Sequence, residues 1–241
     1  MRRLGQVTNA AQRSEEILGT EEIPSDPDAR PLALFDLDGT LTNPADGIVS
    51  CHRWALSELD IEFDPDMDTS TLIGPPAEEA HALLGVPPEQ IAESTALYRE
   101  RFAIAGWLDD TLYDGVAELL DELKAAGWVL GVATMKIEQF AQRILERVGI
   151  ADRFDVIAGS DTKRTRTTKK AIIAHAMATL ETPPNGVAMI GDRRHDIEAA
   201  KALQMTAIGA GWGFGTIDEL IGANADAVAL TPSDVRDVLL G

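Results

Sequence analysis

Short apolar runs alternate with amphipathic segments over most of the chain. The runs occupy residues 31–34, 129–134, 154–158, 187–190 and 205–208. Predominantly apolar runs of this length are typical of strands that are buried on both faces of a parallel sheet. The segments between them have helical spacing, as in residues 138–148, where Ile144, Leu145 and Val148 would face a core. The pattern therefore predicts an α/β fold with a Rossmann-like parallel sheet.

Residues 47–111 break this alternation, because helical segments follow one another there without a strand. The helices are predicted over residues 46–56, 75–84 and 88–103, and two of them begin at prolines, which suit a first helical turn. We predict an all-helical subdomain, residues 47–111, inserted into a core formed by residues 30–46 and 112–241. Residues 1–29 are polar and acidic, which predicts a mobile or loosely docked N-terminal extension.

Acidic side chains follow two of the apolar runs. Asp36 and Asp38 come directly after the run at 31–34, and glycine and threonine then turn the chain away. Side chains two residues apart in extended chain point the same way, so both carboxylates can converge at the carboxyl end of a strand. Open α/β sheets build their sites at that end. A surface Asp-Gly turn after an ordinary strand is the alternative interpretation.

Asp192 and Asp196 form a second acidic pair. Asp192 follows the run at 187–190, and Asp196 lies one turn into a predicted helix, from which it can face back toward Asp192. A favourable charge at a helix N-terminus is the alternative explanation for Asp196. Together the two pairs predict an oxygen-rich, negatively charged pocket. Such a pocket suits Mg²⁺, which binds carboxylates, water and phosphate oxygens.

These residues resemble the motifs of the haloacid-dehalogenase-like (HAD) phosphatases, most closely those of the phosphoglycolate-phosphatase-like branch. Residues 36–41 (Asp-Leu-Asp-Gly-Thr-Leu) and 191–196 (Gly-Asp-Arg-Arg-His-Asp) resemble the first and fourth motifs. Thr134, at the end of an apolar run, is similar to the hydroxyl residue of the second motif. Lys169 is similar to the lysine that opens a helix in the third motif, with the adjacent Lys170 as the alternative.

The resemblance covers the chain from about Leu32 to the C-terminus, and it implies a Mg²⁺-dependent phosphomonoester hydrolase with a helical cap between the first and second motifs. Asp36 would attack phosphorus and form an aspartyl phosphate. Asp38 would protonate the leaving oxygen and later activate water. Thr134 and Lys169 would bind the phosphoryl group. The implied metal-binding residues are Asp36, Asp38 through its main-chain carbonyl, Asp192, and Asp196 directly or through water.

The second aspartate of the first motif separates branches of the family. Dehalogenases need no protonated leaving group and lack this residue, so Asp38 favours phosphate esters over haloacids and phosphonates. A sugar-phosphate mutase shares all four motifs and is the alternative enzyme. A non-catalytic phosphate-binding scaffold on the same fold is a third hypothesis, although its expected mark, loss of a motif residue, is absent from this sequence.

The substrate would be a small phosphorylated metabolite, and the pattern leaves open whether it is phosphoglycolate, a nucleotide, a sugar phosphate or pyrophosphate. Gly74 and Pro75 are the predicted cap contacts with it, because glycine permits close approach of a ligand. Weaker candidates, each more often a solvated helix residue, are Arg53, Tyr98, Arg99 and Arg101. The basic residues 163–166 depart from the family pattern and indicate either a second anion contact or a solvated loop.

Composition sets further limits. The chain has 241 residues and a net charge of −19, which disfavours nucleic acid and anionic membranes as partners. Cys51 is the only cysteine, so no intrachain disulfide can form, and we expect its thiol to be buried as a small apolar group. No apolar stretch approaches the ~20 residues of a membrane span, and no secretory signal is evident. We therefore predict a soluble cytoplasmic protein that is a monomer or weak homodimer.

Overall fold

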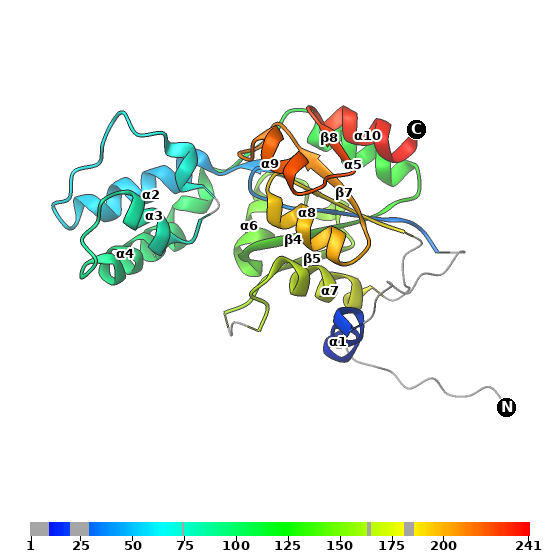
Figure 1. Ribbon diagram of the computed structural model, residues 1–241, viewed down its shortest axis with the longest axis horizontal. Coiled ribbons are helices and arrows are strands. Elements are labelled where there is room, and N and C mark those ends of the chain that lie inside the picture. The colour runs from blue at the N-terminus through cyan, green and yellow to red at the C-terminus, as the bar shows by residue number, and fades with distance from the viewer. Residues whose placement is uncertain (1–9, 20–28, 74, 163–164, 181–185) are drawn as a thin grey trace. The chain divides into compact units, whose positions relative to one another are not determined.

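The computed structural model describes residues 10–19, 29–73, 75–162, 165–180 and 186–241 (Figure 1). The chain divides into two compact units, one of Met1–Leu41 with Asp114–Gly241 and one of Thr42–Tyr113. The bounds predicted for the inserted subdomain, residues 47–111, lie within the smaller unit. In the described residues, no helix is long and apolar enough to cross a membrane.

The larger unit is an α/β structure. Its strands are β1 (Leu32–Phe35), β4 (Val129–Ile137), β5 (Val156–Ser160), β6 (Val187–Gly191), β7 (Thr206–Ala210) and β8 (Ala227–Ala229). Its helices are α1 (Ala10–Gly19), α5 (Val116–Ala125), α6 (Glu138–Arg147), α7 (Lys169–Thr179), α8 (Arg194–Ala202), α9 (Ile217–Gly222) and α10 (Pro232–Leu240), with a 3₁₀ turn at Ala151–Arg153.

The six strands form one parallel sheet in the order β5-β4-β1-β6-β7-β8. Its central strand, β1, is buried along its whole length. The register pairs Phe35, the last residue of β1, with Val132 of β4 and Ile190 of β6. The chain crosses from β5 to β6 on the other side of β1, and ligands of open α/β sheets bind at such a reversal. The fold class predicted from the sequence is confirmed.

Helices cover both faces of this sheet (Figure 1). α8 contacts both α7 and α9, whereas α5 contacts α10. This division agrees with right-handed crossovers, which place helices on opposite faces when the chain moves in opposite directions along the sheet. α7 therefore passes over the sheet to bring the chain back beside β1, and its first residue is Lys169.

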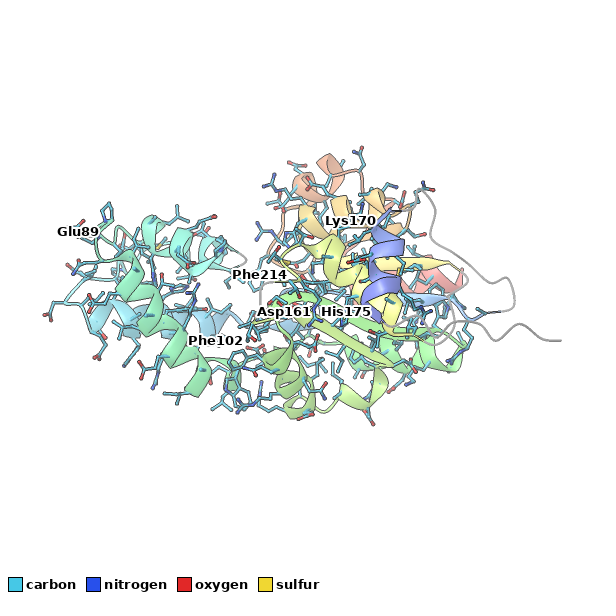
Figure 2. The ribbon with its side chains drawn as sticks, turned by 90° about the horizontal axis from the view of Figure 1, so that it is seen from below. Glu89, Phe102, Asp161, Lys170, His175 and Phe214 are labelled. Carbon is cyan, nitrogen blue, oxygen red and sulfur yellow. The ribbon has the colours of Figure 1, made fainter. Side chains whose placement is uncertain are left out.

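Part of the N-terminal extension is docked, which differs from the mobile or loosely held segment that its composition predicts. α1 packs along α7, the helix on which Figure 2 labels Lys170 and His175. Arg13 donates a hydrogen bond to the carbonyl of Leu180 at 2.8 Å, and Ile17 is buried in the core. One buried isoleucine in a polar segment is too weak a periodic signal to predict this helix. Residues 1–9 and 20–28 lie outside the described part of the chain.

The smaller unit is built mainly of helices, α2 (Ala45–Ser57), α3 (Ala77–Leu83) and α4 (Ile91–Ile104), with 3₁₀ turns at Thr69–Leu72 and Gly106–Leu108. Where the chain enters and leaves the predicted helical insertion, residues 47–111, β2 (Thr42–Asn43) pairs antiparallel with β3 (Thr111–Leu112), a pairing that was not predicted. Two-residue strands are too short to produce an alternating pattern. Cys51 is buried as expected, and burial raises the pKa of its thiol to about 11.

A buried chain of polar side chains links the three helices of this unit. His52 of α2 and His81 of α3 are joined between Nδ1 and Nε2 at 3.0 Å, and Ser94 of α4 contacts Nδ1 of His81 at 2.8 Å. Tyr98 stacks on His52 with ring centroids 4.3 Å apart. Burial, with the neighbouring His81, lowers the pKa of His52 to about 3. Both rings are thus held as neutral partners in a hydrogen-bonded chain.

We predict that this network makes stability depend on pH. The pKa of His52 is lowered from 6.5 to about 3, so its contribution is complete above pH 6.5 and is lost as pH falls from 6.5 toward 3. Between pH 7.5 and 5.5, His52 alone should lower the free energy of unfolding by about 1.4 kcal/mol. Urea unfolding followed by circular dichroism would measure this. His52→Gln should flatten the dependence, and an unchanged pH profile in that variant would contradict the assignment.

Candidate active site

Asp36 follows β1 directly and is held in place by the end of the sheet. Its main-chain N–H donates to the carbonyl of Ile190 at 2.9 Å, which continues the β1–β6 ladder by one residue. Its carboxylate oxygen Oδ1 accepts a hydrogen bond from the N–H of Leu37 at 2.7 Å. Asp36 is 6% exposed. A carboxylate is therefore presented, nearly buried, at the carboxyl end of the central strand.

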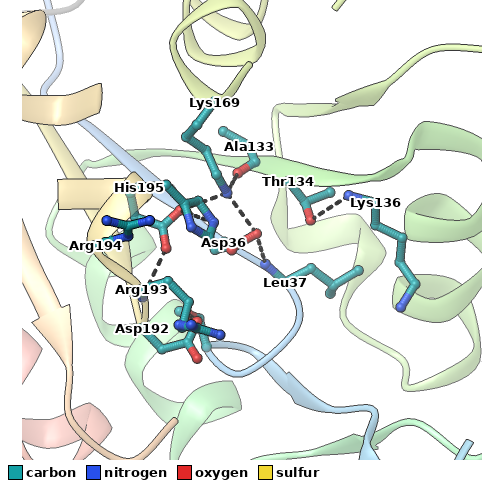
Figure 3. Close-up of polar contacts among 12 residues, drawn as sticks. Asp36, Leu37, Ala133, Thr134, Lys136, Lys169, Asp192, Arg193, Arg194 and His195 are labelled. Atoms are coloured by element: carbon teal, nitrogen blue, oxygen red, sulfur yellow. Dashed lines mark hydrogen bonds and ion pairs between the residues drawn. The ribbon is translucent and has the colours of Figure 1, made fainter. Parts of the chain in front are cut away.

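Lys169 bridges two of the acidic residues. Its Nζ lies 2.9 Å from Oδ1 of Asp36 and 2.7 Å from Oδ1 of Asp196, and it donates to the carbonyl of Ala133 at 2.8 Å (Figure 3). Thr168 caps α7 by accepting a hydrogen bond from Ala171, which places Lys169 at the first helical position. Of the two lysines that the sequence left as alternatives, Lys169 is the one in contact with Asp36.

Asp192 and Asp196 are both buried, at the end of β6 and the start of α8, and Asp196 contacts this lysine. Asp192 accepts hydrogen bonds from the N–H of Phe214 at 2.9 Å and the hydroxyl of Thr40 at 3.4 Å. Asp196 accepts one from the N–H of Arg193 at 3.1 Å, inside its own helical turn. Its side chain thus both caps α8, as the helix N-terminus interpretation expects, and pairs with Lys169, while its role as a metal ligand stays a prediction.

Glycines make room for these carboxylates. Gly39 has a φ of +84°, and a Cβ there would lie 2.2 Å from Oδ2 of Asp192. A Cβ at Gly213 would lie 2.3 Å from the Cβ of Asp192, and one at Gly191 would lie 2.3 Å from Cγ of Asp196. The absence of a side chain at these three glycines therefore leaves the space that the carboxylates of Asp192 and Asp196 occupy.

The buried charges shift one another's pKa values in opposite directions. Burial alone would raise the pKa of Asp36, but Lys169, His195 and the hydrogen bonds outweigh it and lower that pKa. Burial would lower the pKa of Lys169, but Asp196 and Asp36 outweigh it and raise that pKa. Burial raises the pKa of Asp196, with Asp36 adding to the effect against Lys169. Asp36 and Lys169 are therefore an ion pair at neutral pH.

Asp192 is the carboxylate of the cluster whose pKa is raised to near neutrality. Burial, with repulsion from Asp36 and Asp196, raises the pKa of Asp192 to about 7. Lys169 pairs with two of the three buried carboxylates, Asp36 and Asp196, so the site has an excess of negative charge. A divalent cation would relieve that excess, and carboxylate oxygens are the ligands that hard cations prefer. The residues therefore fit the metal ion that the motifs imply.

The geometry adds His195 to the possible ligands. One ligand atom from each of Asp36, His195 and Asp196 lies within 4.8 Å of the others. His195 lies inside the fourth motif, but the sequence pattern assigned it no role. The half-exposed imidazole of His195 lies beside two buried carboxylates, with its Nε2 at 3.8 Å from Oδ1 of Asp196.

Asp38 and Thr134 lie on a neighbouring side of the site, where sequence reasoning missed a second lysine. Lys136 donates from Nζ to Oδ1 and Oδ2 of Asp38 at 2.7 and 2.9 Å. Its main-chain N–H donates to the hydroxyl of Thr134 at 3.2 Å (Figure 3). Thr134 and Lys136 both belong to the final part of β4, next to β1 in the sheet.

The candidate substrate anchors of the smaller unit are engaged within that unit. Arg99 pairs with Glu78 at 2.7 Å, and Tyr98 stacks on His52. Two further arginines lie over aromatic rings, Arg53 over Phe63 at 4.7 Å and Arg101 over Trp54 at 5.7 Å. Pro75 is half-buried in the same unit. Gly74 lies outside the described residues, so the predicted contact of Gly74 with a ligand stays a prediction.

The basic loop ends in an arginine that is turned inward. Arg166 donates to the carbonyl of Gly159 at 2.9 Å, to Oε2 of Glu138 at 2.7 Å and to Nε2 of His175 at 2.9 Å. These bonds tie the end of β5 and the start of α6 to α7. Arg166 is thus a structural contact, and residues 163–164 lie outside the described part of the chain.

The Lys169 bridge generates a stability prediction. Lys169→Met would leave Asp36 and Asp196 buried without their cation, so we expect the free energy of unfolding at pH 7.5 to fall by about 3–5 kcal/mol. Lys170→Met is the matched control and should change it by about 0.5 kcal/mol or less. Urea denaturation without divalent cations would measure both variants. Equal changes in the free energy of unfolding for the two substitutions would show that the Lys169 bridge does not stabilise the fold.

Comparisons with known proteins identify the family of the chain. Residues 33–210 match the family model described as haloacid dehalogenase-like hydrolase. The chain is 39% identical over 211 residues to the tyrosine-protein kinase PtkA of Mycobacterium tuberculosis, covering 86% of this chain and 72% of PtkA. It is 38% identical over 192 residues to a 5′-nucleotidase of Pseudomonas aeruginosa, covering 79% and 86%.

Further similarity comes from a phosphoglycolate phosphatase and from a solved structure. The phosphatase, from Colwellia psychrerythraea, is 30% identical over 190 residues, which cover 75% of this chain and 84% of that protein. The crystal structure of a predicted phosphatase from Clostridium acetobutylicum superposes with a TM-score of 0.77 at 33% identity, covering 88% of this chain and 99% of that one. With the family model matching most of its length, the chain belongs to the haloacid dehalogenase-like hydrolases.

Proposed function

We propose that the protein is a Mg²⁺-dependent phosphomonoester hydrolase that acts on a small phosphorylated metabolite through an aspartyl phosphate. The observation that carries the proposal is the carboxylate of Asp36, which is nearly buried at the carboxyl end of β1 and kept ionised by Lys169 at 2.9 Å. An ionised carboxylate in a low-dielectric site is a competent nucleophile toward phosphorus. Three of the named relatives and neighbours are a nucleotidase, a phosphoglycolate phosphatase and a predicted phosphatase.

The first half-reaction transfers the phosphoryl group to the enzyme. Because Oδ1 of Asp36 accepts hydrogen bonds from Lys169 and Leu37, Oδ2 is the attacking atom. It forms a bond to phosphorus as the bond to the leaving oxygen breaks. Asp38 gives its proton to that oxygen, which departs as an alcohol. The product of this step is an acyl phosphate on Asp36 and a carboxylate on Asp38.

The second half-reaction returns the enzyme to its starting state. Asp38, now a carboxylate, removes a proton from a water molecule whose oxygen attacks phosphorus. The bond between phosphorus and Asp36 breaks, inorganic phosphate leaves, and Asp38 is again protonated. Lys169 and Thr134 stabilise the equatorial phosphoryl oxygens by charge and hydrogen bonding. Because Lys169 already pairs with Asp36 and Asp196, its ammonium is in position before substrate arrives.

Mg²⁺ would be held by Asp36, Asp192 and the main-chain carbonyl of Asp38, with Asp196 as a ligand directly or through water. When bound, it supplies positive charge that offsets the repulsion between a carboxylate nucleophile and a phosphate dianion. The excess of buried acids over buried ammonium in this cluster supports the assignment.

A phosphoryl transferase is the second candidate, because the similarity to PtkA extends over most of this chain. Transfer to a tyrosine would need a hydroxyl acceptor in place of water in the second half-reaction. Incubation with labelled ATP and a tyrosine-containing protein would distinguish the two, since a transferase labels the protein while a hydrolase releases only phosphate. A sugar-phosphate mutase would instead isomerise a hexose phosphate, in the presence of a bisphosphate, without releasing phosphate.

We predict that Asp36→Asn nearly abolishes phosphate release from a phosphomonoester panel assayed with Mg²⁺. The amide cannot form the covalent intermediate. Asp155→Asn, a substitution outside the acidic cluster, is the control for expression and folding. Turnover by Asp36→Asn comparable to that of the parent enzyme would refute the assigned nucleophile. No turnover by the parent with any divalent cation would favour the scaffold hypothesis.

Thr134→Ala should behave differently. It removes one preorganised hydrogen-bond donor, so we expect kcat to fall by about 10²–10³ while activity stays measurable. Steady-state kinetics on the best ester of the panel would test this. Full retention of kcat would remove Thr134 from the site.

A further inference from the structure

Lys136 is fixed against the residue that handles the leaving group. Its ammonium donates to both carboxylate oxygens of Asp38, at 2.7 and 2.9 Å. The lysine side chain is only 7% exposed, whereas that of Asp38 is 27% exposed. The Lys136 main chain is bonded to Thr134, and β4 reaches this point only after an irregularity in its pairing with β5 between Ala133 and Ile137. Two hydrogen bonds therefore hold the ammonium against Asp38, and a third fixes the Lys136 main chain beside Thr134.

The proposed reaction requires this ion pair to rearrange. To act as the acid, Asp38 must take up a proton from solvent and turn that oxygen toward the leaving oxygen, and it then gives up at least one of the two hydrogen bonds from Lys136. An ammonium that is almost buried loses stabilisation when an anionic partner moves away. An anionic group on the leaving group would replace the carboxylate oxygen that has turned, so such a substrate makes the rearrangement favourable.

Distance permits that exchange. A leaving oxygen in hydrogen-bond contact with Asp38 lies within about 5.5 Å of Nζ of Lys136, because two successive hydrogen bonds separate them. A carboxylate or phosphate attached one or two bonds from the leaving oxygen can therefore contact the ammonium directly. A nucleoside or a neutral sugar has no such group at that position. The chain's net charge of −19 means that attraction for an anion must come from local cations such as this one.

We propose that Lys136 is a specificity residue that binds an anionic group on the leaving group, next to the ester or anhydride oxygen. This inference rests on the proposed hydrolase function and names the chemical class of its preferred substrates. Asp38 releases the ammonium as it contacts the leaving oxygen, and the substrate's anion takes its place. Binding of the leaving group by Lys136 thereby releases Asp38, which then protonates the leaving oxygen.

The test uses two esters of similar size that differ in charge. Phosphoglycolate carries a carboxylate next to the ester carbon, and 2-hydroxyethyl phosphate carries a neutral hydroxyl there. The full-length protein with Mg²⁺ should show a kcat/KM for phosphoglycolate at least about tenfold higher, since one charge-assisted contact distinguishes the two. Lys136→Met should lower kcat/KM for both esters, because Asp38 loses its partner, but it should reduce the ratio between them about tenfold or more. Lys136→Arg should keep the preference.

Pyrophosphate provides a second arm, because its leaving group carries a phosphate instead of a carboxylate. Each value is compared with that for 2-hydroxyethyl phosphate. A reduced ratio in Lys136→Met for phosphoglycolate identifies a carboxylate as the anion, and a reduced ratio for pyrophosphate identifies a phosphate; either or both support the proposal. Lys201→Met, which removes a surface lysine paired with Asp226 at 2.6 Å, is the matched control and should leave the ratios unchanged. Thermal unfolding would confirm that each variant is folded.

The outcomes separate this inference from the proposed function. Equal losses of kcat/KM for charged and neutral esters in Lys136→Met would overturn the specificity role and leave Lys136 as a positioning residue for Asp38. A parent enzyme that hydrolyses both esters equally well would overturn it too. Absence of hydrolysis of every ester, by contrast, would overturn the proposed function itself.

Discussion

The buried ammonium of Lys169 holds the site together. It lies 2.9 Å from Asp36 and 2.7 Å from Asp196, with side-chain exposures of 2%, 8% and 0% for the three residues. These side chains come from the ends of β1, α7 and α8, which the sheet brings to one edge. A lysine at that depth is tolerated only with anionic partners, and the acids are tolerated only with the lysine. The fold therefore brings these three side chains together, and their ion pairs in turn stabilise the fold.

The same cluster is left with more negative charge than it neutralises. Asp192 shows the consequence, since its pKa rises to about 7 beside the other two acids. Stability alone would not favour a third buried carboxylate, Asp192, near the two that pair with Lys169, and strain of this kind is concentrated at functional sites. A divalent cation bound at these carboxylates would offset the excess. Lys136 and Asp38 form a second, more exposed pair that can rearrange.

Much of this arrangement is predictable from the sequence, for identifiable reasons. Apolar runs report strands buried on both faces, so the parallel sheet and the positions of Asp36 and Asp192 at strand ends follow directly. Lys136 was missed because its partner, Asp38, lies 98 positions away, and no local pattern reports such a contact. Among the described side chains of α1, Ile17 is the one that is buried in the core, and the β2–β3 pair has two residues per strand. These features depend on tertiary contacts, which produce no periodic pattern of apolar residues in the sequence.

The nucleophilic role of Asp36 is the central claim, and chemical trapping of the intermediate tests it most directly. Borohydride reduces an aspartyl phosphate to homoserine, which mass spectrometry of peptides locates to a residue. If Asp36 is the nucleophile, enzyme quenched during turnover of a phosphomonoester will contain homoserine at position 36, and enzyme without substrate will not. Homoserine at Asp38, or at no acidic residue during confirmed turnover, would contradict the assignment.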